Sequence, residues 1–95
     1  MDLPLLDGIM MANSLHYVKD QISFLLFIKK YLKPQGKLVL IEYNADTGNM
    51  WVPYPVSFVR FCELCKETGL QPPKLLSTIS SRFLNEIYSS ETRLS

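Results

Sequence analysis

Apolar residues along the chain fall into short continuous runs and into faces with helical spacing. Ile9 to Ala12 is a short apolar run and predicts a strand. Leu38 to Ile41 is a second, continuous run, as is typical of a strand covered on both faces. From about Asp20 to Leu32 the pattern predicts a helix with Asp20 as its N-cap. The apolar residues of its face are Ile22, Leu25, Leu26, Ile28 and Leu32.

Turn-forming residues separate these elements. Asp7 and Gly8 predict a turn before the first strand, and Asn13 to Tyr17 predicts a bend that leads into the helix. Pro34 has no backbone N–H, so it cannot continue the helix. Gly36 is expected to supply the positive φ of a Pro-x-Gly turn.

The second half of the chain predicts a helix and two strands. The helix runs from about Ser57, a natural N-cap, to Thr68, and Gly69 is a natural stop. The strand-like runs are about Lys74 to Ser80 and Asn85 to Ser90. The connection between them is short, so they are expected to form an antiparallel hairpin.

The order of the elements indicates an α/β fold. The first two strands are joined through a helix, which predicts parallel neighbours with a right-handed crossover. The final strand pair is expected to add at one edge and to give a mixed sheet. A length of 95 residues allows one small domain.

The charge and the composition of the chain argue against some classes of binding partner. Ten Lys and Arg residues are scattered among nine acidic ones, for a net charge of +1, which argues against binding to nucleic acid or to an acidic membrane surface. The start MDLPLLDG has no signal-peptide pattern, and no apolar run approaches membrane-spanning length. We therefore expect a cytoplasmic protein. Cys62 and Cys65 have Cys-x-x-Cys spacing, but His16 is the single histidine, so we expect two reduced thiols and no metal site.

Four segments carry a resemblance to a known family. Leu6 to Asn13 (LDGIMMAN) resembles the fourth strand of class I S-adenosylmethionine-dependent methyltransferases, and Leu15 to Val18 (LHYV) resembles the LHHV that follows it. Leu32 to Leu38 (LKPQGKL) resembles the family's LKPGG turn, with Gln35 in place of the first glycine. Gly69-Leu70 resembles the aGF before the sixth strand.

The resemblance implies half of a Rossmann-like methyltransferase sheet: two parallel strands with crossover helices and a terminal antiparallel pair. Residues 1–95 would form a single partial domain, because nothing in them resembles the family's first motif, acid-x-Gly-x-Gly-x-Gly, or the following ribose-binding acid. The intact parent would transfer a methyl group from S-adenosylmethionine to a small-molecule acceptor. This chain alone is expected to bind no cofactor and to be inactive. Whether it is an enzyme is therefore left open.

The resemblance also implies candidate site residues, each with a plainer alternative. Ala12 and Asn13, at the end of the first strand, would lie beside the methionine part of the cofactor, or would only make a turn. His16 is a possible general base, but a histidine packed at a helix start, with one nitrogen on a backbone carbonyl, is the preferred interpretation.

The acceptor pocket is expected after the second strand. Tyr43 and Asn44 end that strand together with Glu42, and Trp51 lies in the long irregular stretch that follows. The alternative is that the aromatic residues of this stretch only cover the sheet edge.

A second class of function is a non-catalytic α/β interaction module. In the family's sheet the fourth strand has neighbours on both sides, and the neighbour from the first half is not in this sequence. Ile9 to Ala12 would then be an open edge, and we expect a homodimer that pairs through it. Half of another Rossmann enzyme is a third alternative, which the LKPQGKLVLIE string disfavours.

Overall fold

A computed structural model describes residues 5–45, 48, 52–80 and 86–94 of the chain. The strands are β1 (Leu6–Ala12), β2 (Leu32–Tyr43), β3 (Lys74–Ser80) and β4 (Glu86–Arg93). The helices are α1 (Gln21–Lys29) and α2 (Phe58–Thr68), and a short 3-10 helix covers Leu15–Tyr17. These bounds confirm the predicted order of strand, helix, strand, helix and strand pair.

The strands form one mixed sheet in the order β1-β2-β4-β3. β1 and β2 are parallel and β3 is antiparallel to β4, as the sequence predicted. The strand pair joins the sheet through β4, which is antiparallel to β2. The predicted hairpin connection, 81–84, and the first residue of the run predicted after it, 85, lie outside the described part of the chain.

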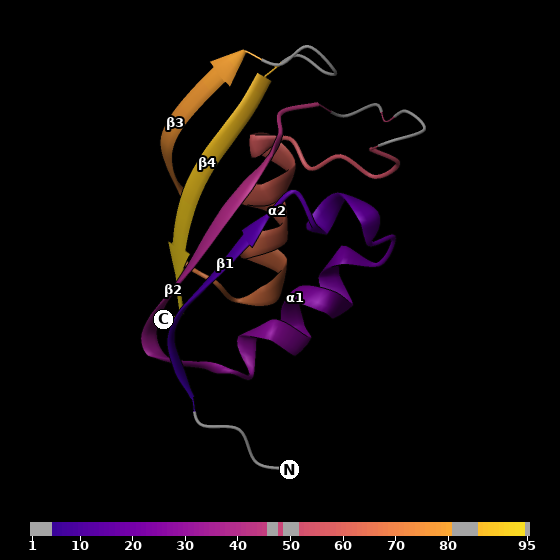
Figure 1. The fold of residues 1–95 in the computed structure, drawn as a ribbon. Coiled ribbons are helices and arrows are strands. Elements are labelled where there is room, and N and C mark those ends of the chain that lie inside the picture. Colours follow the sequence, from indigo (N-terminus) through magenta and orange to yellow (C-terminus); the bar gives the residue numbers. More distant parts are fainter. Residues whose placement is uncertain (1–4, 46–47, 49–51, 81–85, 95) are drawn as a thin grey trace.

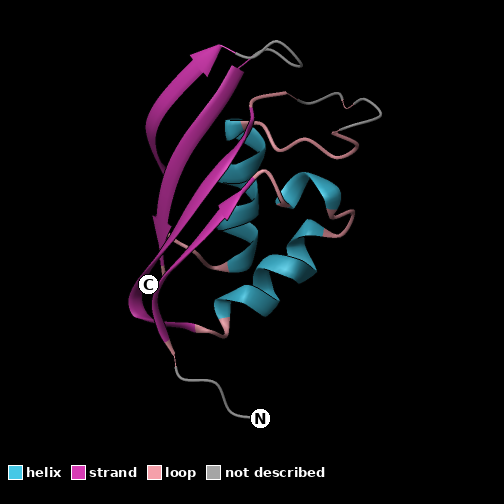
Figure 2. Ribbon diagram, viewed as in Figure 1, coloured by secondary structure: helices cyan, strands magenta, loops and turns pink. Residues whose placement is uncertain are grey.

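Both helices pack against the same face of the sheet, and the opposite face carries no helix in the described chain (Figures 1 and 2). The core lies between the helices and the sheet. Its fully buried members include Leu15 and Leu25 from the α1 side, Leu38 and Leu40 from β2, and Phe61 and Leu64 from α2. On β2 the buried positions alternate, because successive side chains of a strand point to opposite faces.

The predicted caps are confirmed. The Asp20 side chain accepts the N–H of Ser23 at the start of α1, and the Ser57 side chain accepts the N–H of Arg60 at the start of α2. Gly69 ends α2 in the left-handed region with φ 79°, where glycine carries no steric penalty.

The start of β2 corrects two expectations. The first helix ends at Lys29 instead of Leu32, because the backbone of Leu32 already pairs with Leu6 of β1. The Pro-x-Gly segment is an irregularity within β2, and the positive φ, 66°, belongs to Gln35 and not to Gly36. Gly36 is needed for a different reason: a Cβ there would lie 2.8 Å from the carbonyl oxygen of Lys33.

The predicted turn at Asp7 and Gly8 is also wrong. Both residues lie inside β1, and Gly8 pairs with Lys37. The register of β1 against β2 shifts between Leu6 and Gly8, opposite the irregular part of β2. The Asp-Gly pair therefore accommodates a shift between two paired strands instead of reversing the chain.

Candidate functional site

Ala12 and Asn13 lie where the sequence placed them, at the carboxyl end of β1. Ala12 pairs with Ile41 of β2, and the N–H of Asn13 donates to the carbonyl of Ile41 at 2.9 Å. Both residues are exposed, and Asn13 has a left-handed backbone with φ 54°. Ligands of open α/β sheets bind beyond the carboxyl ends of parallel strands, so these two residues occupy a position suited to a ligand.

His16 is buried against Glu42, which lies near the carboxyl end of β2. The His16 side chain is 2% exposed and the Glu42 side chain is fully buried. His16 Nδ1 lies 2.6 Å from Glu42 Oε1. Glu42 Oε2 accepts the backbone N–H groups of Leu15, at 2.9 Å, and of His16, at 3.3 Å.

This geometry changes the interpretation of His16. The histidine is packed at a helix start, as preferred, but its Nδ1 partner is a carboxylate instead of the expected backbone carbonyl. Its ring also lies against Tyr17 and Tyr43, with ring centroids 4.3 and 5.9 Å away. A role as general base remains a prediction.

Glu42 is the residue of this site whose role the sequence analysis missed. The signal was present in the strand: Leu38 and Leu40 are buried, and Glu42 follows at the same two-residue spacing. A carboxylate in line with two core leucines must be buried, and a buried carboxylate requires hydrogen-bond donors.

Of the predicted acceptor residues, Asn44 makes hydrogen bonds within the chain. Its Nδ2 donates to Glu86 Oε1 at 2.7 Å, and its Oδ1 accepts the N–H of Phe58, the first residue of α2, at 2.9 Å. Asn44 therefore joins the end of β2 to α2 and β4. Tyr43 is half-buried beside His16. Trp51 lies outside the described residues.

A small hollow of about 280 Å³ opens beside the His16 segment. It is lined by Lys19, Gln21, Pro53, Tyr54, Pro55 and Arg60. The N–H of Tyr54 donates to the carbonyl of His16 at 2.9 Å, and Gln21 Nε2 donates to the carbonyl of Tyr54 at 2.9 Å. These bonds hold Tyr54, at the end of the long irregular stretch, next to the 3-10 helix. The cationic residues of this hollow were not among the candidate site residues predicted from the sequence.

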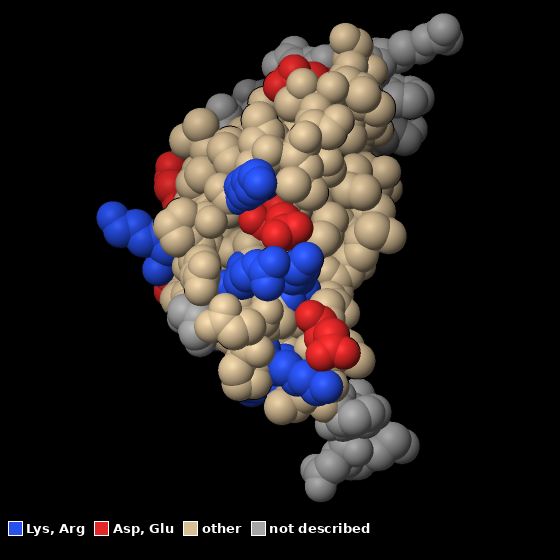
Figure 3. Space-filling model, turned by 90° about the vertical axis from the view of Figure 1, so that its left-hand side faces the viewer, with Lys and Arg blue, Asp and Glu red and all other residues tan. Residues whose placement is uncertain are grey.

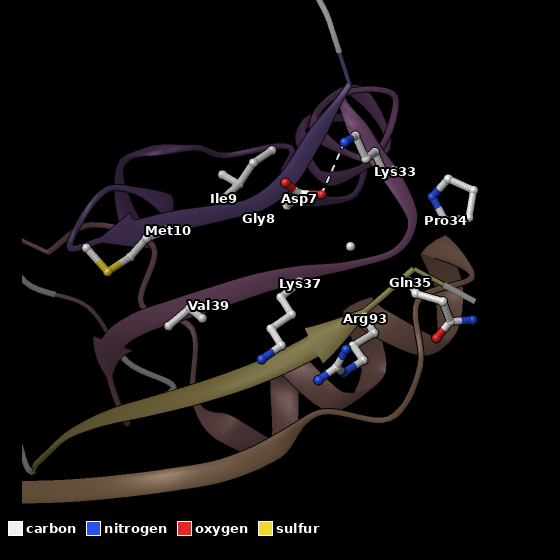
Figure 4. Close-up of a pocket in the computed structure, with 11 residues that line it drawn as sticks. Asp7, Gly8, Ile9, Met10, Lys33, Pro34, Gln35, Lys37, Val39 and Arg93 are labelled. Carbon is white, nitrogen blue, oxygen red and sulfur yellow. Dashed lines mark ion pairs between the residues drawn. The ribbon is translucent and has the colours of Figure 1, made fainter.

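A larger hollow of about 700 Å³ lies at the other end of β1 (Figure 4). Its charged lining residues are Asp7, Lys33, Lys37 and Arg93, and Lys33 Nζ lies 3.3 Å from Asp7 Oδ1. It lies near the amino end of β1, away from Asn13, so it is separate from the predicted crevice. Figure 3 shows that basic and acidic side chains are interspersed on the sheet face without helices, as expected for a solvated surface.

Cys62 and Cys65 are both free thiols on α2. Cys65 is buried, and burial raises the pKa of its thiol to about 11. No group of three or more potential metal ligands occurs among the residues that the structure describes. That the two cysteines hold no zinc stays a prediction.

None of the helices in the described ranges is long and apolar enough to cross a membrane.

No family model matches the chain. A search of curated proteins finds Histamine N-methyltransferase A of Xenopus laevis, which is 32% identical over 88 residues. The match takes in 90% of this chain but 30% of the relative, so the chain spans less than a third of that protein's length.

Solved structures with the same fold are also methyltransferases. The N-methyltransferase NodS from Bradyrhizobium japonicum, in complex with S-adenosylhomocysteine, matches with a TM-score of 0.71 and 18% identity; the match covers 99% of this chain and 48% of NodS. The 1,6-didemethyltoxoflavin-N1-methyltransferase from Burkholderia thailandensis matches with a TM-score of 0.72 and 15% identity, over 100% of this chain and 47% of that one. The CurJ carbon methyltransferase matches with a TM-score of 0.73 and 21% identity, over 94% of this chain and 29% of that one.

At these identities the solved structures establish the fold, a mixed α/β sheet that corresponds to part of a Rossmann-like methyltransferase. The curated relative adds a likeness in sequence along nearly all of this chain. Both agree with the segments that carried the resemblance in the sequence. The chain is therefore similar, in sequence and in fold, to one part of the class I S-adenosylmethionine-dependent methyltransferases.

Proposed function

We propose that the chain forms one part of an S-adenosylmethionine-dependent methyltransferase that modifies a small-molecule acceptor. The observation that carries the proposal is the parallel β1–β2 pair, which presents Ala12 and Asn13 at its carboxyl ends. The curated relative is named for methyl transfer to histamine, a small amine, and NodS is also an N-methyltransferase. We therefore propose a nitrogen atom as the methyl acceptor.

The residues present fit one side of a cofactor site. Ala12 and Asn13 are exposed at the strand ends, where they can contact the methionine part of S-adenosylmethionine. When bound, that cofactor supplies the methyl group on a sulfonium. The 95 residues contain no acid-x-Gly-x-Gly-x-Gly sequence, whose glycines allow the backbone to approach a nucleotide closely. We infer that this chain by itself binds the cofactor weakly or not at all and is inactive.

Calorimetric titration of the 95-residue chain with S-adenosylmethionine and with S-adenosylhomocysteine tests this proposal. We expect no saturation below the millimolar range and no methyl transfer to small amines. Micromolar affinity with turnover would contradict the view that the chain is an incomplete enzyme. A chimera gives the positive test: the matched segment of this chain replaces the corresponding 88 residues of the Xenopus relative. It should bind S-adenosylhomocysteine, and a folded chimera that does not bind it would count against the proposed role.

We also propose a cytoplasmic location, supported by two cysteines that are both free thiols. Fractionation of cells that express a tagged chain is the direct measurement. Recovery from a secretory compartment would contradict it.

A second candidate function, supported by a separate observation, is self-association as an interaction module. β1 stands at the edge of the sheet, and the side chains of Leu6 and Met10 on it are 43% and 69% exposed. An edge strand has unpaired N–H and C=O groups that can pair with another chain. We propose a twofold homodimer in which two β1 strands run antiparallel through Ile9 to Ala12.

A further inference from the structure

The carboxylate of Glu42 joins two segments that are far apart in the sequence. It lies near the end of β2, and it accepts hydrogen bonds from groups in the connection between β1 and α1: the two backbone N–H groups of Leu15 and His16, and the ring of His16. This connection starts at Asn13, directly after Ala12. One buried side chain therefore fixes the segment that follows the predicted cofactor residues.

Stability alone is a poor explanation for this arrangement. Glu42 is fully buried and His16 nearly so, and moving charged or strongly polar groups out of water costs free energy that their interaction only partly restores. An apolar side chain at position 42 would continue the row of Leu38 and Leu40 without that cost. What the buried pair provides instead is a defined position for the groups that it binds.

The pair also defines the tautomer of His16. A carboxylate only accepts hydrogen bonds, so His16 Nδ1 must carry the hydrogen that lies between it and Glu42 Oε1. When the ring is neutral, Nε2 then has a free lone pair and acts as an acceptor.

We infer that Glu42 is a positioning residue for the site at the carboxyl ends of β1 and β2. It holds the connection that begins at Asn13 against the end of β2, and it keeps the neutral His16 ring protonated at Nδ1. The inference rests on the proposed function for what the site binds, and on the contacts of Glu42 for everything else. It goes beyond the proposed function because it assigns a role to a residue that would not itself touch the cofactor.

The variant Glu42→Gln separates this role from simple packing, because glutamine keeps the volume but has one oxygen and one NH₂ group. The oxygen is expected to face the two backbone N–H groups, since the reverse orientation would place the NH₂ group against these two donors. The NH₂ group then faces His16 Nδ1, which must become an acceptor. The tautomer should therefore switch from Nδ1–H to Nε2–H.

Nitrogen-15 NMR of the imidazole ring measures this directly, because His16 is the single histidine of the chain. We expect the Nδ1–H tautomer in the unaltered protein and the Nε2–H tautomer in Glu42→Gln. The amide hydrogens of Leu15 and His16 should exchange roughly tenfold faster or more in the variant, because the acceptor of both bonds is then neutral and the bonds are weaker. The matched control is Glu91→Gln, which removes a carboxylate of β4 that lies 3.6 Å from Arg93; it should change neither reading.

A pair of His16 variants keeps the test decisive even if Glu42→Gln does not fold. The side-chain NH₂ of asparagine occupies the place of Nδ1, whereas that of glutamine occupies the place of Nε2. His16→Asn should keep the slow amide exchange of Leu15, and His16→Gln should lose it. An Nε2–H tautomer in the unaltered protein, or equal effects of the two His16 variants, would overturn the inference. These readings need neither cofactor nor turnover, so they leave the proposed function to its own test.

Discussion

At the scale of single residues, several polar groups inside the core have specific hydrogen-bond partners. The Tyr88 hydroxyl is fully buried and donates to the carbonyl of Val56 at 2.6 Å. Burial raises the pKa of this phenol strongly, and the charge of Glu42 raises it further. The phenol therefore stays protonated and remains a donor throughout the pH range in which the protein is handled.

Removing this hydroxyl should destabilise the protein. In Tyr88→Phe the carbonyl of Val56 loses its partner inside the core. We expect the free energy of unfolding to fall by about 1–3 kcal/mol, measured by urea denaturation. Tyr17→Phe is the control, because Tyr17 is 64% exposed; its change should be within about 0.5 kcal/mol. Equal effects of the two variants would show that the Val56 bond contributes nothing.

The two cysteines should differ in reactivity although they lie on the same helix. The thiolate is the reactive form, and the raised pKa of Cys65, about 11, leaves very little thiolate at about pH 8. Iodoacetamide should therefore modify Cys62, which is partly buried, well before Cys65. Mass spectrometry of the modified peptides reads this out, and in denaturant both should react. Modification of both at one rate in the folded protein, or stoichiometric zinc on elemental analysis, would contradict this.

At the scale of elements, the predicted helix caps agree with the structure, whereas the predicted end of the first helix and the start of β2 do not. Caps depend on one side chain and the next turn of the backbone, which is why Asp20, Ser57 and Gly69 were correctly assigned. The irregular segment of β2 depends on contacts outside it. The N–H of Gln35 donates to the carbonyl of Leu94, and the N–H of Leu94 donates to the carbonyl of Gly36.

The backbone at Gln35 and Gly36 leads to opposite predictions for neighbouring residues. Gln35 holds a left-handed conformation that costs a non-glycine residue about 1 kcal/mol, so Gln35→Gly should stabilise the protein by up to about that amount. Gly36→Ala should destabilise it by about 1–3 kcal/mol, because the new Cβ meets the Lys33 carbonyl oxygen. Thermal and urea unfolding measure both.

Gly8→Ala is the control for these variants, because a Cβ at Gly8 would make only an ordinary contact, 3.5 Å from the Lys37 carbonyl oxygen. Its change should be small. A stabilising Gly36→Ala would show that the close approach to the Lys33 carbonyl oxygen does not require a glycine at this position.

At the scale of the whole molecule, the sheet is covered unequally. The helices protect one face, and β1 forms one edge, as Figure 1 shows. The N–H of Asn13 points to β2, so the alternation of the strand directs the N–H groups of Met10 and Ala12 to the open edge. A strand from another chain would bond to these groups.

Proline at either position should therefore weaken self-association. Met10→Pro or Ala12→Pro removes an N–H from the edge without removing a bond to β2. Sedimentation at tens of micromolar should show a dimer for the unaltered chain and a shift toward monomer for the variants. Met10→Lys is a second variant, because a charge also protects an edge. A folded monomer in the unaltered protein would contradict the proposed dimer.

The sequence by itself determined the order of the elements, the parallel pairing of the first two strands, the antiparallel pairing of the last two strands and the helix caps. Hydrophobic spacing reports which side of an element faces the core, and Asp20, Ser57 and Gly69 act on the backbone within one turn of themselves. The segments from Leu6 to Leu38 also indicated the family. Ala12 and Asn13 were placed at a strand end for the same reason, since a strand's carboxyl end is a property of the chain's direction.

Only the tertiary structure decided which side chains meet at the site. Glu42 is 26 residues from His16 in the sequence, and their contact exists because β2 lies parallel to β1 and brings its end to the connection that follows β1. The same holds for Asn44 and Phe58, and for the strained backbone of Gln35 beside Leu94. Local patterns define faces and ends, but hydrogen bonds between distant segments depend on the register of the strands, which forms only when the whole sheet is assembled.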